Sequence, residues 1–238
     1  VNLEFEASVC GGVPVIRSLK EGLVANKISK IFGIFNGTSN FILSTMEKEN
    51  KNFDEVLSDA KKLGYAESNP TADLNGDDVA SKLKILTSLC FNSFLNNNIY
   101  VEGIKNIDKT DIDNASKLGY KIKLLGFAEL LNKKIYQRVH PALIRKNSYV
   151  ASIDGVLNAV IIDGKPVGQS IIQGEGAGPA ATTSALISDI SSILRGNIKF
   201  PFSLSSKKRK KLKFQSIDNR LFSAYLRFEV VDKPGVLS

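Results

Sequence analysis

The loop and helix that decide the fold read Tyr65-Ala66-Glu67-Ser68-Asn69-Pro70-Thr71-Ala72-Asp73-Leu74-Asn75-Gly76-Asp77-Asp78-Val79-Ala80-Ser81-Lys82. Asn69-Pro70 disfavours a helix at its own position, so we expect residues 65–75 to form a loop. A fresh helix is predicted from about Asp77 to Cys90, with inward-facing apolar residues at Val79, Leu83, Leu86 and Leu89. The stretch therefore gathers polar side chains at a helix start and on the loop before it.

Asp78 and Lys82 are four residues apart, so the predicted helix presents both on one face. Glu67 and Asp73 lie on the preceding loop and can fold over the same point. Three carboxylates and a lysine suit a small zwitterion, because the acids hold an ammonium group while the lysine donates a proton to an oxygen. The competing interpretation is that Asp78 and Lys82 form an ordinary surface ion pair worth about 0.3–0.5 kcal/mol. Acidic residues are then present only because the helix dipole favours them near a helix start.

Upstream, the sequence predicts three helices and a strand. The expected elements are a helix from about Val15 to Lys27, a strand from Ile28 to Phe35, a helix from Asn40 towards Glu49, and a helix after Asn52. Thr38 or Ser39 is placed to cap the second helix. Asn52 and Glu55 are spaced as a capping box, and Gly64 sits where a left-handed residue ends a helix.

Downstream of Tyr120 the sequence is typical of strands. Residues 121–130 and 135–139 are candidate strands, and residues 156–162 and 167–172 predict a hairpin about a tight Asp163-Gly164 turn. A last helix is expected from Pro179 to about Arg195. Because helices and strands mix without regular βαβ alternation, the predicted class is α+β, or mixed α/β, with a mixed sheet and helices packed on one face.

The composition is typical of a globular protein in a reducing compartment. The chain has 238 residues, 43% hydrophobic and 24% charged, enough for one large domain or two small ones. No run approaches the roughly 20 apolar residues of a membrane-spanning helix. Cys10 and Cys90 are too few for a disulfide framework. We expect a cytoplasmic protein without a membrane partner and, because Val1 replaces an initiator Met, a further segment upstream.

The net charge of +8 is concentrated in one short run. The basic residues of this run are Lys207, Lys208, Arg209, Lys210, Lys211 and Lys213. A nucleic-acid-binding fold spreads its basic residues over a face, whereas a single run beside serines is typical of a solvated linker. We therefore expect a linker and no nucleic-acid partner, with phosphate binding as the alternative.

Four segments in order along the chain resemble motifs of the homoserine dehydrogenase family. Residues 67–82 match Glu-x-x-Pro-x-x-Asp-Leu-x-Gly-x-Asp-x-x-x-Lys. Residues 5–16 are similar to the family's Glu-Ala-x-Val-x-x-Gly-x-Pro stretch, residues 33–43 to its Gly-Thr-x-Asn turn and helix, and residues 174–179 to its late glycine turn. The resemblance implies NADP- or NAD-dependent interconversion of L-aspartate 4-semialdehyde and L-homoserine, in threonine, methionine and isoleucine biosynthesis.

The resemblance also assigns roles to residues of this chain. Lys82 would be catalytic, as the proton donor to the substrate oxygen. Substrate binding would fall to Glu67, Asp73, Asp78, Tyr65 and Thr38. The backbone of Gly64 and of Gly178 would meet the nicotinamide cofactor, since free N–H groups before a helix suit a polar or phosphate group.

A monovalent cation site, usually sodium, is implied at Glu6 with the carbonyl oxygens of Val9, Gly11 and Val13. One carboxylate and a tight turn of carbonyl oxygens are hard ligands suited to such an ion. Cys10 departs from the family pattern, which often has Gly there. Because its neighbours would ligate through backbone oxygens, we expect the site to survive.

The same resemblance divides the chain into four parts. Residues 1–178 would form the catalytic, substrate-binding and dimerisation domain, 179–200 a helix returning to a nucleotide-binding domain, and 201–217 a basic linker. Residues 225–237, a strand pattern followed by a Pro234-Gly235 turn, resemble the opening of an ACT domain. Residues 218–238 would thus hold the first strand and turn of a truncated ACT domain, with threonine as effector. No glycine-rich dinucleotide turn occurs in residues 1–60, so we expect the N-terminal Rossmann domain to be absent from this chain and the fragment alone to be inactive.

Two other functions compete with this one. A semialdehyde dehydrogenase that acts through a thioester needs a cysteine with a partnered base, and neither Cys10 nor Cys90 sits in a recognisable elbow. An amino-acid-sensing regulatory module could instead bind nucleic acid through residues 207–213, with salt-sensitive affinity. The apolar hairpin further predicts a homodimer through the sheet region, with residues near 1–14 and 146–172 at the interface.

Overall fold

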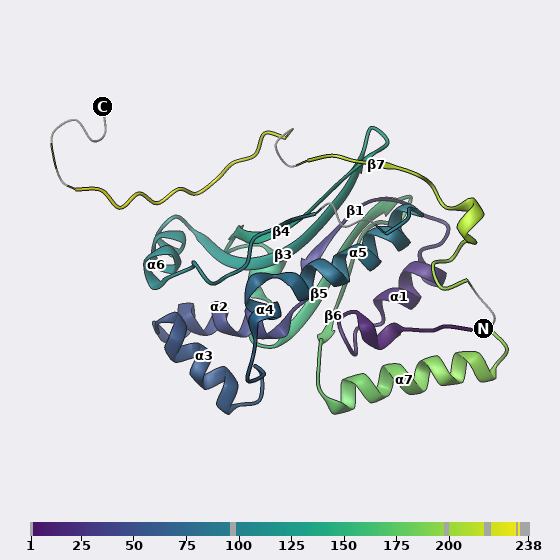
Figure 1. The fold of residues 1–238 in the computed structure, drawn as a ribbon, viewed down its shortest axis with the longest axis horizontal. Coiled ribbons are helices and arrows are strands. Elements are labelled where there is room, and N and C mark those ends of the chain that lie inside the picture. The colour runs from purple at the N-terminus through teal and green to yellow at the C-terminus, as the bar shows by residue number, and fades with distance from the viewer. Residues whose placement is uncertain (1, 96–98, 198–199, 217–219, 232, 234–238) are drawn as a thin grey trace.

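A seven-stranded sheet forms the centre of the molecule (Figure 1). The computed structural model describes residues 2–95, 99–197, 200–216, 220–231 and 233. The strands are β1 (Lys27–Ile34), β2 (Tyr100–Val101), β3 (Tyr120–Leu131), β4 (Lys134–Arg145), β5 (Leu157–Lys165), β6 (Gly168–Glu175) and β7 (Lys213–Phe214). Their order is β2-β4-β3-β1-β5-β6, and β7 also pairs with β4. The long strands are antiparallel whereas β2 and β7 run parallel to β4, so the sheet is mixed, as predicted.

Helices pack on one face of this sheet, as predicted (Figure 1). They are α1 (Val15–Arg17), α2 (Gly37–Glu49), α3 (Phe53–Lys62), α4 (Thr71–Asn75), α5 (Asp77–Phe91), α6 (Lys109–Lys117) and α7 (Pro179–Leu194). Leu83 and Leu86 of α5 are fully buried in the main core with Ile31 of β1 and Val139 of β4. Burial of a leucine contributes about 1.5–3 kcal/mol, so this packing fixes the helix that carries residues 77–82.

The α3 helix has the boundaries that its end signals predict. The Glu55 carboxylate accepts a hydrogen bond from Asn52 N at 2.9 Å, which completes the capping box. Gly64 has φ +76°, the left-handed conformation expected beyond the helix end. Local capping chemistry therefore fixes this element without help from distant residues.

Two N-terminal expectations were wrong in detail. Residues 15–27 form no continuous helix: α1 runs into a single π-helical turn, Ser18–Gly22, and β1 already begins at Lys27. Gly22 weakens the helix, because glycine is a poor helix former. The cap of α2 is Asn36, whose side chain accepts from Ser39 N at 2.8 Å, and neither Thr38 nor Ser39.

The β5–β6 hairpin exists, but its turn is not Asp163-Gly164. Both residues lie within β5, where the Asp163 carboxylate pairs with Lys30 Nζ at 2.7 Å. The chain turns at Lys165-Pro166-Val167, and Gly168 follows with φ +83°. Pro166 has no N–H for a strand ladder, so it displaces the turn from the Asp-Gly signal.

The opposite face of the sheet carries a smaller apolar cluster. Its buried members are Ile34, Leu125, Val150, Ile153, Ala159 and Ile161. The 3-10 helix Tyr149–Ser152 supplies part of this cluster, while Ile171 of β6, opposite Ile161 in register, stays 41% exposed. Residues 9–13 do not belong to this cluster. Val9, Cys10 and Val13 are buried in the main core, so their side chains are not free for the predicted dimer contact.

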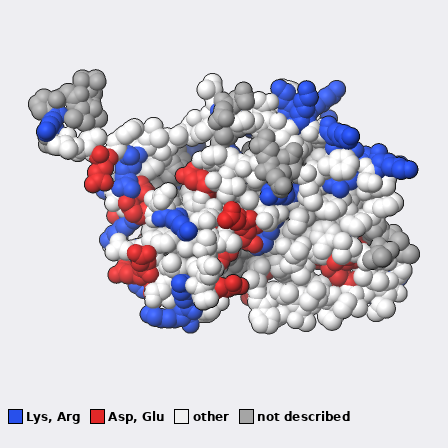
Figure 2. Space-filling view, viewed as in Figure 1, with Lys and Arg blue, Asp and Glu red and all other residues white. Residues whose placement is uncertain are grey.

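The C-terminal segment corrects the simple linker interpretation. Figure 2 shows basic side chains at the margin of the molecule where this run lies, but β7 joins the sheet and Leu212 packs on the main core. Residues 220–231, expected to contain an ACT strand, form no strand here, and the expected turn around residues 234–235 lies outside the described residues.

Candidate functional site

Asp78 and Lys82 form the ion pair that their spacing predicts. Lys82 Nζ lies 2.8 Å from Asp78 Oδ2 and donates to the backbone oxygen of Phe35 at 2.9 Å. Gly76, with φ +86°, turns the chain sharply into α5 and directs its first two turns at the end of β1. The Lys82 side chain remains 18% exposed, so it is not sealed inside the core.

Asn36 joins the two acids of the site, a role that the sequence did not predict. Its Nδ2 donates to Asp73 Oδ1 at 2.7 Å and to Asp78 Oδ2 at 2.9 Å, while its Oδ1 caps α2. One side chain thus connects the end of β1 with α4 and α5. The Asn-Gly-Thr-Ser-Asn turn was noticed, but the contacts span about forty residues of sequence and no local signal reveals them.

Asp73 lies on α4, a short helix where the sequence predicted only loop. Its backbone oxygen accepts from Ser39 Oγ at 2.9 Å, which ties α4 to α2. Burial raises the pKa of the Asp73 carboxyl above its ordinary value, and the neighbouring Asp78 carboxylate adds to the rise, against the lowering effect of the Asn36 hydrogen bond. Asp73 and Asp78 thus place two carboxyl groups beside the single ammonium of Lys82, an arrangement that suits an incoming ammonium group.

Two glycines make room for the ring of Phe35, the residue whose backbone carbonyl Lys82 contacts. A Cβ on Gly126 would come within 2.5 Å of the Phe35 ring, and one on Gly33 within 2.9 Å of the same ring and 2.0 Å of Ala159 O. Any side chain at either position would displace Phe35. The glycines therefore help to place the backbone oxygen that orients Lys82.

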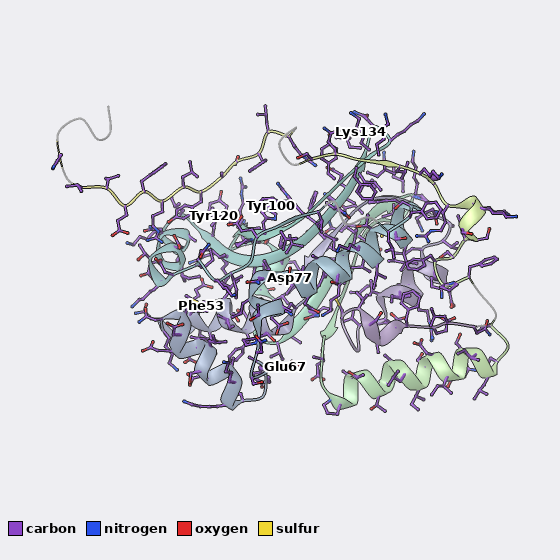
Figure 3. The ribbon with its side chains drawn as sticks, in the orientation of Figure 1. Phe53, Glu67, Asp77, Tyr100, Tyr120 and Lys134 are labelled. Atoms are coloured by element: carbon purple, nitrogen blue, oxygen red, sulfur yellow. The ribbon has the colours of Figure 1, made fainter. Side chains whose placement is uncertain are left out.

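The remaining predicted substrate residues lie on the adjacent loop. Thr38 Oγ1 donates to Tyr65 O at 2.6 Å, and the Tyr65 ring packs on Phe41 with centroids 5.0 Å apart. Glu67 is exposed and makes no hydrogen bond or ion pair among the described residues. Figure 3 shows it on the loop before α4, the short helix that carries Asp73.

The two predicted cofactor glycines have open surroundings. Gly64 has φ +76° and Gly178 has φ +107°, and a Cβ on either would meet no atom within 4 Å. Gly178 directly precedes Pro179 at the start of α7, as predicted. Both therefore present accessible backbone, while positive φ values disfavour other residues there.

The predicted cation loop is folded tightly, but its carboxylate is already engaged. Glu6 accepts hydrogen bonds from Ile16 N at 2.7 Å and Arg17 N at 2.8 Å, at the start of α1. Burial raises the pKa of Glu6, and these two backbone bonds act in the opposite direction. Val13 O accepts from Val15 N, whereas no hydrogen bond from the described residues reaches the carbonyl oxygens of Val9 and Gly11.

Neither cysteine is set up as a nucleophile. Burial raises the pKa of Cys10 to about 11 and also raises that of Cys90, and both thiols are inaccessible. Burial, with the Arg138 charge, lowers the pKa of His140 to about 4, so it is neutral at pH 7. Among the described residues no three His, Cys, Asp or Glu side chains are grouped to hold a metal.

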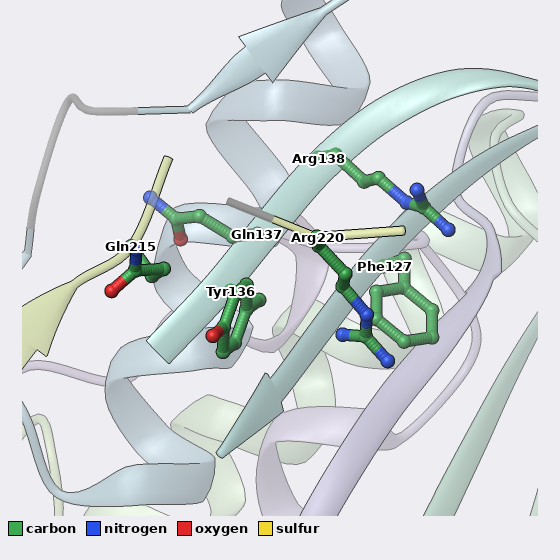
Figure 4. Close-up of a pocket in the computed structure, with 6 residues that line it drawn as sticks. All are labelled: Phe127, Tyr136, Gln137, Arg138, Gln215 and Arg220. Atoms are coloured by element: carbon green, nitrogen blue, oxygen red, sulfur yellow. The ribbon is translucent and has the colours of Figure 1, made fainter. Parts of the chain in front are cut away.

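A small pocket lies on the far face of the sheet (Figure 4). Its lining residues are Phe127, Tyr136, Gln137, Arg138, Gln215 and Arg220. Arg220 pairs with Glu129 at 2.6 Å and lies over the Tyr136 ring at 5.2 Å. No residue of the Lys82 group lines this pocket, so it is separate from the candidate active site.

The comparisons with known proteins agree with this geometry. A family model described as homoserine dehydrogenase matches residues 14–191, the range that contains Asn36, Asp73, Asp78 and Lys82. The chain belongs to the homoserine dehydrogenase family. The family assignment from four sequence motifs is thereby confirmed.

Individual relatives place the chain within longer proteins. It is 42% identical to a homoserine dehydrogenase of Neisseria gonorrhoeae over 100% of this chain and 56% of that protein, and 44% identical to one of Helicobacter pylori over 98% and 55%. A crystal structure of a homoserine dehydrogenase from Thiobacillus denitrificans superimposes with a TM-score of 0.84 at 41% identity, covering 89% of this chain and 51% of the other. The chain thus spans about half the length of these relatives.

Proposed function

We propose that the protein to which this chain belongs is a homoserine dehydrogenase that interconverts L-aspartate 4-semialdehyde and L-homoserine. The observation that carries the proposal is the Lys82 ammonium, held by Asp78 and Phe35 O at the rim of an acidic site joined by Asn36. Lys82 would donate a proton to the substrate oxygen as it gains negative charge. Asp73 and Asp78, with Glu67 on the bordering loop, would hold the ammonium end of the substrate.

NADP or NAD would supply or accept the hydride. A hyperthermophilic archaeal homoserine dehydrogenase has been solved in complex with NADPH. It superimposes on this chain with a TM-score of 0.69 at 28% identity, over 81% of this chain and 55% of the other. Gly64 and Gly178 fit a cofactor contact, because their open surroundings let a planar group approach the backbone. Tyr65 and Thr38 would shape the substrate side of the same space, since their mutual hydrogen bond fixes the loop.

The cation would be held by Glu6 and the carbonyl oxygens of Val9, Gly11 and Val13. The Glu6 carboxylate and Val13 O each accept hydrogen bonds from the start of α1, but their remaining lone pairs can still meet an ion, as can the carbonyl oxygens of Val9 and Gly11. Hard oxygen ligands of this kind suit sodium. Exchange of sodium for tetramethylammonium, at constant ionic strength, should lower thermal stability if this loop binds the smaller ion.

Assembly as a homodimer would cover the far face of the sheet. Phe32 and Ile171 are accessible there, next to the buried Ile161. Ile171→Glu should convert a dimer of the full-length protein into a monomer in light scattering. Val24→Glu, at an exposed site outside the predicted interface, is the matched control. Ile161 is 1% exposed, so a charge there would test folding rather than association.

We also infer a cytoplasmic enzyme with threonine as a regulatory ligand of a C-terminal ACT domain and no nucleic-acid partner. None of the helices in the described part of the chain has the length and apolar composition of a membrane span. Threonine titration of the full-length enzyme should lower homoserine oxidation. Binding of DNA that disappears when residues 207–213 are neutralised would instead support the sensing module.

The direct test of function is an assay of the full-length protein with L-homoserine and NADP⁺ or NAD⁺, followed by cofactor absorbance. We expect cofactor reduction that requires homoserine. A protein that oxidises aspartate semialdehyde only with phosphate, and is inactivated by thiol reagents, would contradict the proposal and favour the thioester alternative.

A further inference from the structure

One member of the basic run at 207–213 is docked while its neighbours are not. Arg209 is partly buried, whereas Lys207, Lys208, Lys210, Lys211 and Lys213 are exposed. The Arg209 guanidinium lies between two aromatic rings, 4.9 Å from the Phe94 centroid and 4.6 Å from that of Phe202. Stacking of this kind is attractive and fixes the plane of the group.

The same guanidinium binds the carboxyl end of α5. Arg209 Nε donates to Ser93 O at 3.0 Å, and one terminal nitrogen donates to Ser93 O and to Ser88 Oγ. Ser88 lies in the last turns of α5, and its own hydroxyl donates to Ser93 O at 2.7 Å. A cation here is favoured, since the carboxyl end of a helix carries partial negative charge.

Backbone contacts extend this attachment to a strap, residues 202–214. Lys210 N donates to the oxygen of Asn92, the residue that ends α5, at 2.7 Å. Phe202 packs on Phe5, with ring centroids 5.7 Å apart, and Phe214 lies in β7 beside β4. The strap thus joins α5 to the N-terminal segment and to the sheet.

The opposite end of α5 carries Asp78 and Lys82. A 15-residue α-helix is stiff. A contact that holds one end of the helix in place along the helix axis therefore also holds the other end. Lys82 reaches Phe35 O, on a different element, only while α5 keeps that position. The contacts at Ser88, Asn92 and Ser93 therefore restrain the alignment of the active-site pair.

We propose that Arg209 is a positioning residue for Asp78 and Lys82, which acts by clamping the carboxyl end of α5 through the strap. The inference rests on the proposed function. Among the described residues, the side chains of the other basic residues of the run make no comparable contact with α5, and Lys210 contributes only through its backbone N–H. Lys208 offers a matched control, since Lys208→Met and Arg209→Met each remove one positive charge from the same run.

The test measures homoserine oxidation by the full-length protein. In Arg209→Met, kcat should fall about 10- to 100-fold, as small displacements of catalytic groups can cost that much, while KM for the cofactor stays unchanged. Lys208→Met should match the unmodified enzyme. Free guanidinium at low millimolar concentration should restore part of the kcat of Arg209→Gly and leave Lys208→Gly unaffected.

Hydrogen exchange separates this inference from the proposed function. Arg209→Met should speed amide exchange in residues 77–82 as well as in residues 86–93, whether or not the protein oxidises homoserine. Faster exchange confined to residues 86–93, with kcat unchanged and a lower Tm, would show a purely structural role and overturn the proposal. If the unmodified protein does not use homoserine, only the proposed function fails, and exchange at residues 77–82 still decides the clamp.

Discussion

Lys82 and Lys123 have similar partners and very different freedom. Lys82 Nζ contacts Asp78 at 2.8 Å and Phe35 O at 2.9 Å, and its side chain is 18% exposed. Lys123 Nζ contacts Asp154 at 2.7 Å, Ile153 O at 2.6 Å and Asn40 Oδ1 at 3.0 Å, and its side chain is 1% exposed. Each lysine therefore has one acid and one backbone oxygen.

The difference between them lies in the third donor. An ammonium group has three N–H donors. Lys123 uses all three on protein oxygens, and burial lowers its pKa. Lys82 uses two on the described residues, and its remaining donor can meet a substrate oxygen. A saturated, buried lysine stabilises the fold, whereas an unsaturated, accessible lysine can do chemistry.

The largest effect that this comparison predicts is on turnover. Lys82→Met in the full-length enzyme should lower kcat for homoserine about 10²- to 10⁴-fold, since a positioned general acid contributes that much. Its unfolding midpoint in urea should change little. Lys84→Met, two residues further along α5, is the control and should keep normal kcat. Normal turnover in Lys82→Met would exclude it as the proton donor.

A smaller effect is expected from the acid beside Lys82. Asp78→Asn should raise KM for homoserine about 10- to 100-fold, which corresponds to the loss of one charged hydrogen bond of roughly 1.5–3 kcal/mol. Cofactor affinity, measured by fluorescence titration, should stay the same. Asp77→Asn, on the exposed side of the same turn, should have no effect. Parallel loss of cofactor affinity would instead indicate a folding defect.

Lys123→Met should act on stability and leave kcat nearly unchanged. It leaves the buried Asn40 Oδ1 without its Lys123 donor, while Ile153 O keeps only the hydrogen bond from Asn40 Nδ2. The free energy of unfolding should therefore fall by about 1–3 kcal/mol in urea titrations. Lys121→Met removes a more exposed lysine from the same strand and should cost less than about 1 kcal/mol. If Lys123→Met and Lys121→Met lost the same free energy of unfolding, Lys123 would not be the stabilising lysine that its buried contacts indicate.

The smallest effect concerns Asp73 and pH. Its folded-state pKa is raised by burial and then by Asp78, so the ionised carboxylate costs stability at neutral pH. Asp73→Asn should therefore stabilise the fold by about 0.5 kcal/mol at pH 7 while raising KM for homoserine. The stability gain of Asp73→Asn over the unmodified protein should shrink as pH falls through the raised pKa, because the Asp73 carboxyl of the unmodified protein then becomes neutral. Urea titrations at pH 7 and pH 4 measure it.

Local chemistry explains which elements could be predicted from sequence. The capping box of α3, the turn at Gly64 and the Asp78–Lys82 pair depend on residues at most four apart, and all three are confirmed. The hairpin turn was misplaced because two turn signals, Asp163-Gly164 and Pro166, compete within four residues, and only pairing with β1 decides between them.

Long-range contacts explain what the sequence could not reveal. Asn36 meets Asp73 and Asp78 only after β1, α4 and α5 have packed together. Arg209 looked like one more solvated cation, because nothing nearby in sequence announces Ser88, Ser93 or Phe94. The roles of Lys82, Glu67, Gly64 and Gly178 came from the family resemblance and stay predictions.

Chemical rescue of Lys82→Ala tests the central claim most directly. The full-length variant would be assayed for homoserine oxidation with and without added methylammonium or ethylammonium. We predict a strongly reduced kcat that rises with amine concentration, while Lys84→Ala shows no response, because an external amine replaces the missing donor. A near-normal kcat without amine would contradict the account. So would a variant whose activity no amine restores and whose only defect is weaker binding of homoserine.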